Sequence, residues 1–431
     1  MNEIRIGLLG FGTVGAGVVE ALQKNGDLVS RRVGAALVLR RIADLDLQRD
    51  RGVRVPAELL TTDAGSVIRD PQVDVVVELI GGCGVARDFM LEALKLGKPV
   101  VTANKALLAE HGEELYRAAE QNNTEIYCEA SVGGGIPIIK ALREGLVANH
   151  IDAMYGILNG TCNYVLTRME AEGLPFDAVL REAQAEGYAE AEPGLDIDGT
   201  DTAHKAVILA SLAYGFNVPM KRIPVEGIRG IGAADIAYTA ELGYRVKLLA
   251  IIKRVGSEVE VRVHPALVPH DHMLASVGGV FNAVEVVGDV VGTTLYYGLG
   301  AGRAATSSAV ISDLADVAHN LTHGIRRSAS AVRPGTEGRM RSIGGIKARY
   351  YLNVSLLDRP GMLARVAQIL GAHGISIASV LQKESRTEKQ VPVIIITHSA
   401  LENNFQAALE EIDSLDVVGA RTVRLRIEDC A

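Results

Sequence analysis

Residues 4–15 read IRIGLLGFGTVG, an apolar strand that leads through a glycine loop into a helix. The loop has the spacing G-x-G-x-x-G, in which Gly10 permits a tight turn, Gly12 lets a pyrophosphate approach the backbone, and Gly15 allows close packing of helix on strand. Because a strand and a helix flank the motif, it predicts a Rossmann-type dinucleotide site, the alternative being a glycine-rich turn without a ligand. The phosphates would lie at the positive end of the helix. The predicted cofactor contacts in the loop are Gly10, Phe11, Gly12, Thr13, Val14 and Gly15.

Downstream of this loop, short apolar runs alternate with helical patterns over the first 130 residues. The run at 73–80 is almost entirely apolar, as expected of a strand buried on both faces of a sheet. Strands separated by helices indicate βαβ units and a parallel sheet. We therefore predict an α/β dinucleotide-binding domain over residues 1–130. Its expected strands lie at 4–9, 35–43, 73–80, 99–102 and 125–128.

The pattern changes after residue 130. Helical patterns at 138–146 and 200–214, with alternating runs between 245 and 300, predict an α+β catalytic and dimerisation domain over residues 131–303. Its sheet is expected to be open and partly antiparallel. A helix at about 304–321 is expected to complete the first domain.

The last part of the chain is predicted to hold a linker and a third domain. Residues 322–348 are basic and contain glycines and one proline, which is typical of a solvated connection. Residues 349–431 show the order strand, helix, strand, strand, helix, strand of a ferredoxin-like module. A chain cut after Arg333 is therefore expected to remain active.

Composition excludes several classes of protein. The 431 residues carry a net charge of −8, 4% aromatic residues and no tryptophan, which offers no electrostatic or stacking basis for binding nucleic acid. No apolar run approaches the roughly 18 residues needed to cross a bilayer, and the first residues lack the features of a signal peptide. The four cysteines have neither metal-ligand nor C-x-x-C spacing, so we expect free thiols in a cytoplasmic protein.

The end of the second predicted strand bears on the choice between NAD and NADP. An acid at that point binds the ribose 2′-OH of NAD, whereas an arginine accommodates the 2′-phosphate of NADP. The strand ends with LRRIAD at residues 39–44, in which Arg40 favours NADP. Asp44 lies further along and leaves NAD possible. The alternative for Arg40 is an exposed cation without a ligand.

Two lysines have positions suited to chemistry. Lys105 follows a predicted strand, at the sheet edge where ligands bind in such folds. Asp201 and Lys205 are four residues apart on a predicted helix and therefore share one face. Desolvation would favour the neutral amine of Lys205, which suits proton transfer, while Asp201 opposes this and would orient the amine. The alternatives are a solvated loop lysine and an ordinary ion pair. The acid-rich approach from Glu190 suggests a site for a substrate ammonium group.

Taken together, these motifs resemble those of homoserine dehydrogenase. The resemblance runs from residue 1 to about 320. It rests on GLLGFGTVG at 7–15, VTANK at 101–105, EASVGGGIP at 129–137, LNGTCNY at 158–164 and GLDIDGTDTAHK at 194–205. It implies the reversible reduction of L-aspartate 4-semialdehyde to L-homoserine with NAD(P)H, a step toward threonine, methionine and isoleucine.

The resemblance also assigns roles to residues. Lys205 would donate a proton to the aldehyde oxygen, and Lys105 would contact both cofactor and substrate. Glu190 and Asp201 would hold the amino-acid end of the substrate. Further cofactor contacts would be Gly187 and Gly302.

A monovalent cation, usually sodium, is a further implication of the resemblance. Its ligands would be Glu129, Val132, Gly134 and Ile136. A carboxylate with three backbone carbonyls is a suitable cage of hard oxygen ligands. The role of the cation would be structural.

The tail from residue 349 resembles an ACT domain, through LDRPGMLA at 357–364 and GISI at 374–377. In that family such modules pair between chains and bind an amino acid near the first strand–helix turn. The resemblance therefore implies a homodimer or homotetramer and an effector, for which threonine is the first choice. The turn leads into a helix whose free N–H groups could receive a carboxylate. The expected effector contacts are Asp358, Gly361 and Gly374.

Two other functions fit parts of the sequence. One is another NAD(P)-dependent semialdehyde reductase or amino-acid dehydrogenase. A phosphorylating aldehyde dehydrogenase would require a catalytic cysteine, and no cysteine here has an obvious basic partner close in sequence. The other is a non-catalytic regulator that binds a dinucleotide and an amino acid, which would leave the two lysines and the acidic segment unexplained.

Overall fold

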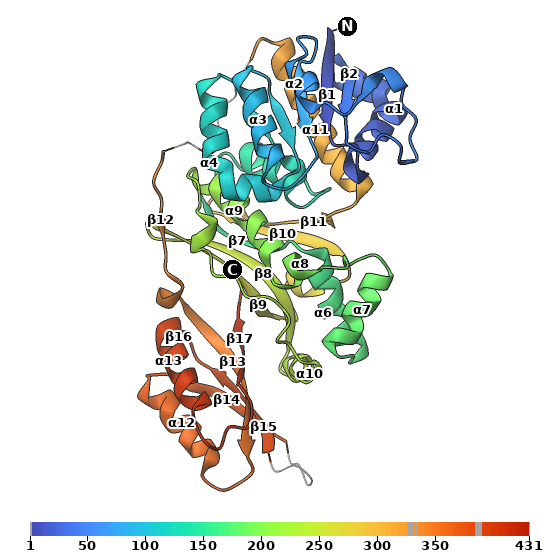
Figure 1. Ribbon diagram of the computed structural model, residues 1–431. Coiled ribbons are helices and arrows are strands. Elements are labelled where there is room, and N and C mark those ends of the chain that lie inside the picture. Colours follow the sequence, from blue (N-terminus) through green and yellow to red (C-terminus); the bar gives the residue numbers. More distant parts are fainter. Residues whose placement is uncertain (1, 326–331, 333–334, 384–389, 431) are drawn as a thin grey trace. The chain divides into compact units, whose positions relative to one another are not determined.

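The computed structural model describes residues 2–325, 332, 335–383 and 390–430 of the chain (Figure 1). The chain divides into two compact units, each assembled from segments far apart in the sequence. The first unit comprises Met1–Leu158, Asp201–Ile223 and Phe281–Gly338, and the second comprises Asn159–Thr200, Pro224–Val280 and Arg339–Ala431. Among the described residues, no helix combines the length and the apolar character needed to cross a membrane.

The first unit contains a parallel sheet in which the described strands have the order β3-β2-β1-β4-β5-β6. Its strand pairings all run parallel. This is the doubly wound order of dinucleotide-binding folds, which bind ligands where the order reverses, here between β1 and β4. The predicted α/β fold class is confirmed. The strands are β1 (Asn2–Leu9), β2 (Ala35–Ala43), β3 (Leu60–Thr61), β4 (Val75–Glu78), β5 (Val100–Thr102) and β6 (Ile126–Tyr127).

Helices α1 and α11 share one apolar core with this sheet. Their ribbons are labelled in Figure 1. Val18 of α1 and Val310 of α11 are buried in the same cluster as Ile6 of β1. The two helices approach closely because Gly17 lacks a side chain, and a Cβ there would lie 2.8 Å from Arg303. The helices around the sheet are α1 (Thr13–Val33), α2 (Ala64–Arg69), α3 (Val85–Lys95), α4 (Lys105–Gln121) and α11 (Arg303–Thr322).

The rest of the first unit contains antiparallel strands and the buried helix α9 (Thr200–Tyr214). The helix predicted at 138–146 is shorter than expected, because α5 (Ile138–Lys140) passes into a π-helical turn at Ala141–Gly145. The strand β10 pairs antiparallel with both of its neighbours in this unit. The strands are β7 (Ile151–Ile157), β10 (Phe281–Gly288) and β11 (Gly292–Leu299).

In the second unit, β8 (Tyr244–Val255) and β9 (Glu258–Pro269) form a long antiparallel hairpin. The intervening turn has Gly256 at φ +62°, a conformation that two-residue hairpin turns require. The alternating pattern of the sequence correctly predicted strands here. The accompanying helices are α6 (Gly160–Glu172), α7 (Phe176–Ala185), α8 (Gly194–Ile197) and α10 (Ala233–Glu241).

The C-terminal module has the strand order β17-β13-β15-β14, which is that of a ferredoxin-like fold and confirms the predicted module. Phe405 of the second module helix stacks on Tyr350 with ring centroids 3.6 Å apart, in the core of the module. The elements are β13 (Lys347–Leu357), α12 (Met362–Ala372), β14 (Ile377–Gln382), β15 (Gln390–Thr397), β16 (Ala400–Leu401), α13 (Glu402–Asp413) and β17 (Val423–Ile427).

The module is joined to the rest of the second unit by main-chain pairing. β17 runs parallel to β9, with Arg426 opposite Ala266. β12 (Arg339–Met340) also pairs with β9, although it lies in the segment predicted to be a solvated linker. That prediction is wrong for residues 339 and 340, because hydrogen bonding to β9 fixes their backbone. Residues 326–331, 333 and 334 of the predicted linker lie outside the described part of the chain.

Buried ion pairs reinforce the same junction. Arg262 Nη2 lies 2.8 Å from Glu428 Oε2, and Arg426 Nη2 lies 2.9 Å from Glu226 Oε1. The side chains of Arg262 and Arg426 are only 3% and 2% exposed. A cut after Arg333 would remove Glu428 and Arg426 and uncover the edge of β9, although Arg262 would keep its pairing with Glu260. We therefore expect the shortened chain to be less stable than the intact one.

Candidate active site

The glycine loop between β1 and α1 has the geometry of a phosphate cradle. Gly10 has φ +95°, and a Cβ there would meet the Leu79 carbonyl oxygen at 2.6 Å. A Cβ on Gly15 would lie 2.1 Å from the Gly10 carbonyl oxygen, whereas one on Gly12 would meet nothing within 4 Å. Gly12 is the N-cap of α1 and gives that helix no side-chain cap. The loop therefore presents open backbone and a helix N-terminus, which fits a pyrophosphate.

A cleft of about 580 Å³ lies beside this loop and is lined in part by Gly10, Gly12 and Asp44. Asp44 follows β2 directly, and its Oδ2 accepts a hydrogen bond of 2.6 Å from the Phe11 N–H. Its Oδ1 lies 3.1 Å from Arg51 Nη2. The Arg51 guanidinium also lies over the Phe11 ring, 5.1 Å from the ring centroid. The position after the second strand is thus occupied by an acid, Asp44, which forms an ion pair with Arg51.

Arg40 does not lie at that position. β2 continues to Ala43, so Arg40 is within the strand rather than at its end. Its guanidinium hydrogen-bonds to Gln72 and lies 3.7 Å from Asp70 Oδ2. The bounds of the strand, 35–43, were predicted correctly, but Arg40 lies within it rather than at its end. The argument for NADP from Arg40 therefore loses its geometric basis.

Lys105, Asp201 and Lys205 converge in the first unit. Lys105 Nζ lies 2.7 Å from Asp201 Oδ1, and Lys205 Nζ lies 2.7 Å from Asp201 Oδ2. Lys205 Nζ also donates a 2.6 Å hydrogen bond to the carbonyl of Leu158. The Asp201 and Lys205 side chains are 6% and 9% exposed, whereas that of Lys105 is 42% exposed. One buried carboxylate therefore bridges two amines, of which one is open to solvent.

The electrostatics of this cluster favour charged groups. Burial by itself raises the pKa of Asp201, but the neighbouring Lys205 and Lys105 outweigh it and hold that pKa well below its usual range. An ionised Asp201 stabilises the ammonium forms of both lysines. The direct contact with Asp201 opposes the effect of desolvation on the Lys205 amine, as the four-residue spacing predicted. Adjacent on α9, burial lowers the pKa of His204.

Sequence reasoning missed Glu78, which organises the loop after β4. Glu78 is fully buried, and its Oε1 accepts the N–H groups of Ile80 and Gly81 at 2.8 and 3.0 Å. Its Oε2 accepts a 2.7 Å hydrogen bond from the Thr102 hydroxyl. Asn104, the N-cap of α4, donates to the Gly82 carbonyl and so ties this loop to the helix that begins with Lys105. The available signal was an acid within an almost wholly apolar strand.

The predicted cation segment contains the buried Glu129, which lies beside the buried Asp313 of α11. The Glu129 carboxylate accepts the N–H groups of Ile139 and Lys140 at 2.9 and 2.8 Å. The Glu129 N–H donates to Asp313 Oδ2 at 2.8 Å. Burial raises the pKa of both carboxyl groups. Two buried acids with raised pKa values form a site that a cation would suit, although the Glu129 carboxylate is already engaged by two amides.

The other predicted ligands of that cation are backbone positions. Gly134 has φ +53°, and a Cβ there would lie 2.5 Å from the Gly300 carbonyl oxygen, so only glycine fits. The Ile136 carbonyl accepts the Ile138 N–H at 2.8 Å, and Val132 is fully buried.

Three further predicted site residues occupy loops or helix ends. Gly302, with φ +110°, is the N-cap of α11. The next residue, Arg303, donates to the Arg51 carbonyl at 3.0 Å, so the start of α11 lies near the loop that holds Asp44. Gly187, with φ +78°, and the exposed Glu190 follow α7 within the second unit.

The predicted effector residues lie at opposite ends of α12. Gly361 has φ +88° and is the N-cap of that helix, immediately after the exposed Asp358 turn. Gly374 follows its last turn. Eleven residues at about 1.5 Å each separate the two ends by about 16 Å. One bound amino acid therefore cannot contact Asp358 and Gly374 of the same chain.

Comparison with known proteins places the chain in a family. Residues 10–129 match the NAD-binding domain of homoserine dehydrogenase, residues 137–315 match homoserine dehydrogenase, and residues 350–417 match the ACT domain. Homoserine dehydrogenase from Neisseria gonorrhoeae is 42% identical over 440 residues, covering 99% of both chains. The enzyme from Bacillus subtilis is 41% identical over 429 residues, again covering 99% of both.

Solved structures agree with this assignment. A homoserine dehydrogenase from Thiobacillus denitrificans is 44% identical, with a TM-score of 0.95 over 100% of this chain and 99% of that one. A hyperthermophilic archaeal homoserine dehydrogenase in complex with NADPH is 27% identical, with a TM-score of 0.62 over 73% of this chain and 97% of that one. The chain belongs to the homoserine dehydrogenase family, oxidoreductases that here combine a nicotinamide-cofactor domain, a catalytic domain and a C-terminal ACT domain.

Proposed function

We propose that the protein catalyses the reversible reduction of L-aspartate 4-semialdehyde to L-homoserine, in the cytoplasm, on the route to threonine, methionine and isoleucine. The observation that carries the proposal is the bridging of Lys105 and Lys205 by the buried Asp201 carboxylate. A carbonyl that is reduced must receive one proton on oxygen, and a positioned ammonium supplies it by general acid catalysis.

Lys205 is the proton donor in this proposal. Asp201 and the Leu158 carbonyl hold its Nζ in place and keep the amine protonated. In the direction of reduction, Lys205 transfers a proton to the aldehyde oxygen as hydride reaches the carbonyl carbon, and in the reverse direction it takes the proton back. The bound nicotinamide cofactor supplies or accepts the hydride.

Lys105 and Asp201 would position the reactants. Lys105 begins α4 beside the Gly81–Gly82 loop at the carboxyl edge of the sheet, where it can contact both cofactor and substrate. Asp201 attracts the substrate ammonium group, together with Glu190. Gly187 is proposed to lie near the cofactor, since a glycine with positive φ leaves backbone open.

For the cofactor we propose binding to the glycine loop, with Gly302 as a further contact, and selection by Asp44 and Arg51. Asp44 suits the ribose 2′-OH of NAD, and Arg51 suits the 2′-phosphate of NADP once it turns from Asp44. Both cofactors are therefore expected to serve. The NADPH complex of the archaeal relative supports the use of NADP, whereas the geometry of Arg40 does not contribute to it.

A monovalent cation, sodium in the first instance, is proposed beside Glu129. The carbonyls of Val132, Gly134 and Ile136 would complete its oxygen ligands. The cation would neutralise the buried acidic pair and stabilise the segment between β6 and α5.

For the ACT module we propose feedback control by threonine in a homodimer or homotetramer. The carboxylate would bind at the N-terminus of α12, near Asp358 and Gly361. Gly374 would contribute only from a second chain, since it lies at the other end of the helix. The strand β14 is the free edge of the module sheet within the described chain, because β9 covers β17, so a second copy would pair along β14.

An assay of cofactor absorbance with L-homoserine tests the proposal. Turnover with L-homoserine and with L-aspartate 4-semialdehyde, but not with other small 2-amino alcohols or aldehydes, is expected. Turnover of another semialdehyde alone would instead identify a related reductase, and cofactor binding without any turnover would favour a regulator.

A further inference from the structure

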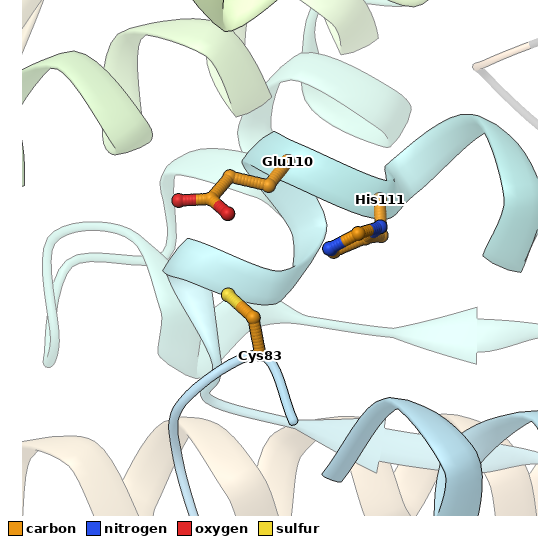
Figure 2. Close-up of side chains that lie close together, drawn as sticks. All are labelled: Cys83, Glu110 and His111. Carbon is orange, nitrogen blue, oxygen red and sulfur yellow. The ribbon is translucent and has the colours of Figure 1, made fainter. Parts of the chain in front are cut away.

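A cluster of three potential metal ligands lies outside the proposed reaction. Cys83 reaches from the loop after β4 toward α4, which carries Glu110 and His111 (Figure 2). One ligand atom from each side chain, a sulfur, a carboxylate oxygen and a ring nitrogen, lies within 4.8 Å of the other two. The proposed mechanism uses none of these three groups.

The backbone on both sides of the cluster is held in place. Asn104 caps α4 and donates a 2.8 Å hydrogen bond to the Gly82 carbonyl, next to Cys83. Glu78 anchors the Gly81 N–H at 3.0 Å. The loop that carries Cys83 is thus fixed to the helix that carries the other two ligands. Preorganised ligands of this kind lose little freedom when they bind an ion.

The cluster is open to solvent on one side. Cys83 and His111 are partly exposed, and the Glu110 side chain is 46% exposed. A groove of about 380 Å³ adjoins it and is lined by Glu110, His111, Glu113, Glu114, Arg117 and Asn217. Glu113 and Glu114 pair with Arg117 and Arg87, which leaves Glu110 as the acid of this groove that faces the cluster. The groove gives an ion a path to the ligands.

The ligand set selects the type of ion. A thiolate disfavours magnesium and calcium, whereas sulfur, imidazole and carboxylate together suit zinc. Zinc–ligand bonds of about 2.0–2.3 Å in a tetrahedron separate ligand atoms by about 3.3–3.8 Å. The present separations, at most 4.8 Å, can close to that range by small rotations of the three side chains, each of which is at least partly exposed. We propose that Cys83, Glu110 and His111 bind one zinc-type divalent cation, with a water in the fourth position.

Glu110 of this cluster contacts His204, the residue next to Lys205. Glu110 Oε1 lies 3.7 Å from His204 Nε2, and His204 precedes Lys205 on α9. An ion that draws Glu110 toward Cys83 removes this partner of His204. It also clamps the Gly81–Gly82 loop against the helix that begins with Lys105. Bound zinc is therefore expected to slow turnover, an expectation that rests on the proposed function.

The test uses the full-length protein freed of metal with a chelator. Cobalt(II) is added and thiolate-to-cobalt charge-transfer absorption is recorded, and zinc affinity is measured by competition with a chromogenic chelator. The variants are Cys83→Ser, Cys83→Ala and His111→Gln. The matched control is Cys430→Ser, since Cys430 is also partly exposed while Cys128 and Cys162 are buried.

Wild type and Cys430→Ser should bind one equivalent with charge-transfer absorption. The Cys83 variants should lose the absorption, and they and His111→Gln should bind zinc at least about tenfold more weakly. Zinc should inhibit wild type but not Cys83→Ser. The site would be overturned if charge-transfer absorption survived in both Cys83 variants or were absent in wild type. It would also be overturned if Cys430→Ser weakened zinc binding as much as the Cys83 variants do.

Zinc binding without inhibition would overturn the coupling to His204. Since the absorption does not depend on turnover, a failure of the proposed reaction is recognised separately. Circular dichroism establishes that each variant is folded.

Discussion

The Asp201 carboxylate lies 2.7 Å from Lys205 Nζ, one helical turn along the buried helix α9. Its second oxygen lies 2.7 Å from Lys105 Nζ, which comes from the first turn of a different helix. A single acid thus fixes the spacing of two amines from separate segments. Such an arrangement holds one buried amine beside a second, solvent-accessible amine.

Lys205→Ala should reduce kcat by about 10²- to 10⁴-fold, because it removes the general acid. Asp201→Asn keeps the size of the side chain but removes its charge, and should reduce kcat and raise KM for homoserine. Enhancement of NADPH fluorescence on binding should persist in both variants, since the glycine loop is untouched. Lys347→Ala, an exposed lysine, is the control. Near-normal turnover of Lys205→Ala would exclude it as the proton donor.

Cofactor choice should respond to Asp44 and Arg51. Asp44→Ser removes the acceptor for the ribose 2′-OH and should shift the ratio of NADPH to NADH affinity upward by about tenfold or more. Arg51→Ala should shift the ratio downward by removing the nearby guanidinium. Arg40→Ala, whose side chain pairs with Asp70 and Gln72, should leave the ratio unchanged. Selective loss of NADPH affinity in Arg40→Ala would restore the interpretation based on the sequence.

The junction between the ACT module and β9 should depend on Glu428. Glu428→Ala removes one of the two carboxylates that pair with the buried Arg262, the other being Glu260. The loss of these charged hydrogen bonds should lower the free energy of unfolding by about 1.5–3 kcal/mol. The matched control is the neighbouring Asp429→Ala. Asp429 is 64% exposed and 3.3 Å from Arg349, so its loss should cost less than about 1 kcal/mol. Urea unfolding followed by circular dichroism measures both, and equal losses would contradict the assignment.

Acid should destabilise the ACT module through Glu402. Burial opposes ionisation of Glu402, but hydrogen bonds from Arg426 lower its pKa from 4.5 to about 2. A carboxyl group whose folded pKa is depressed stabilises the fold above its unfolded pKa. That contribution, about 3 kcal/mol, is lost as the pH falls from about 5 to 2. The melting temperature of wild type should therefore fall over this range. Glu402→Gln should start lower and show a shallower dependence, and an unchanged slope would refute the linkage.

Threonine should inhibit the intact enzyme, and Asp358→Asn should weaken that inhibition at unchanged turnover in its absence. The exposed acid Asp416 of the same module offers a control, Asp416→Asn, which should respond as wild type does. Inhibition curves in threonine measure both. An intact enzyme that ignores threonine would leave the module with a different effector or with a purely structural role.

The sequence alone determined the local elements and the family. The glycine loop, the buried strand at 73–80 and the four-residue spacing of Asp201 and Lys205 depend on neighbours along the chain, so periodicity and turn chemistry predict them. The pairs that span the sequence were decided by the tertiary structure. Asp201 meets Lys105 because two helices converge, and Cys83 meets Glu110 and His111 because a loop is tied to α4.

The folded chain also corrected two predictions. The bounds of β2 were predicted correctly, but Arg40 within it pairs with Asp70 and Gln72, whereas Asp44 occupies the position after the strand. The supposed linker contains β12 because β9 offers it a free edge, a partner some 80 residues earlier in the chain. Hydrogen bonding between distant strands and the pairing of buried charges leave little trace in local sequence pattern, so only the folded chain reveals them.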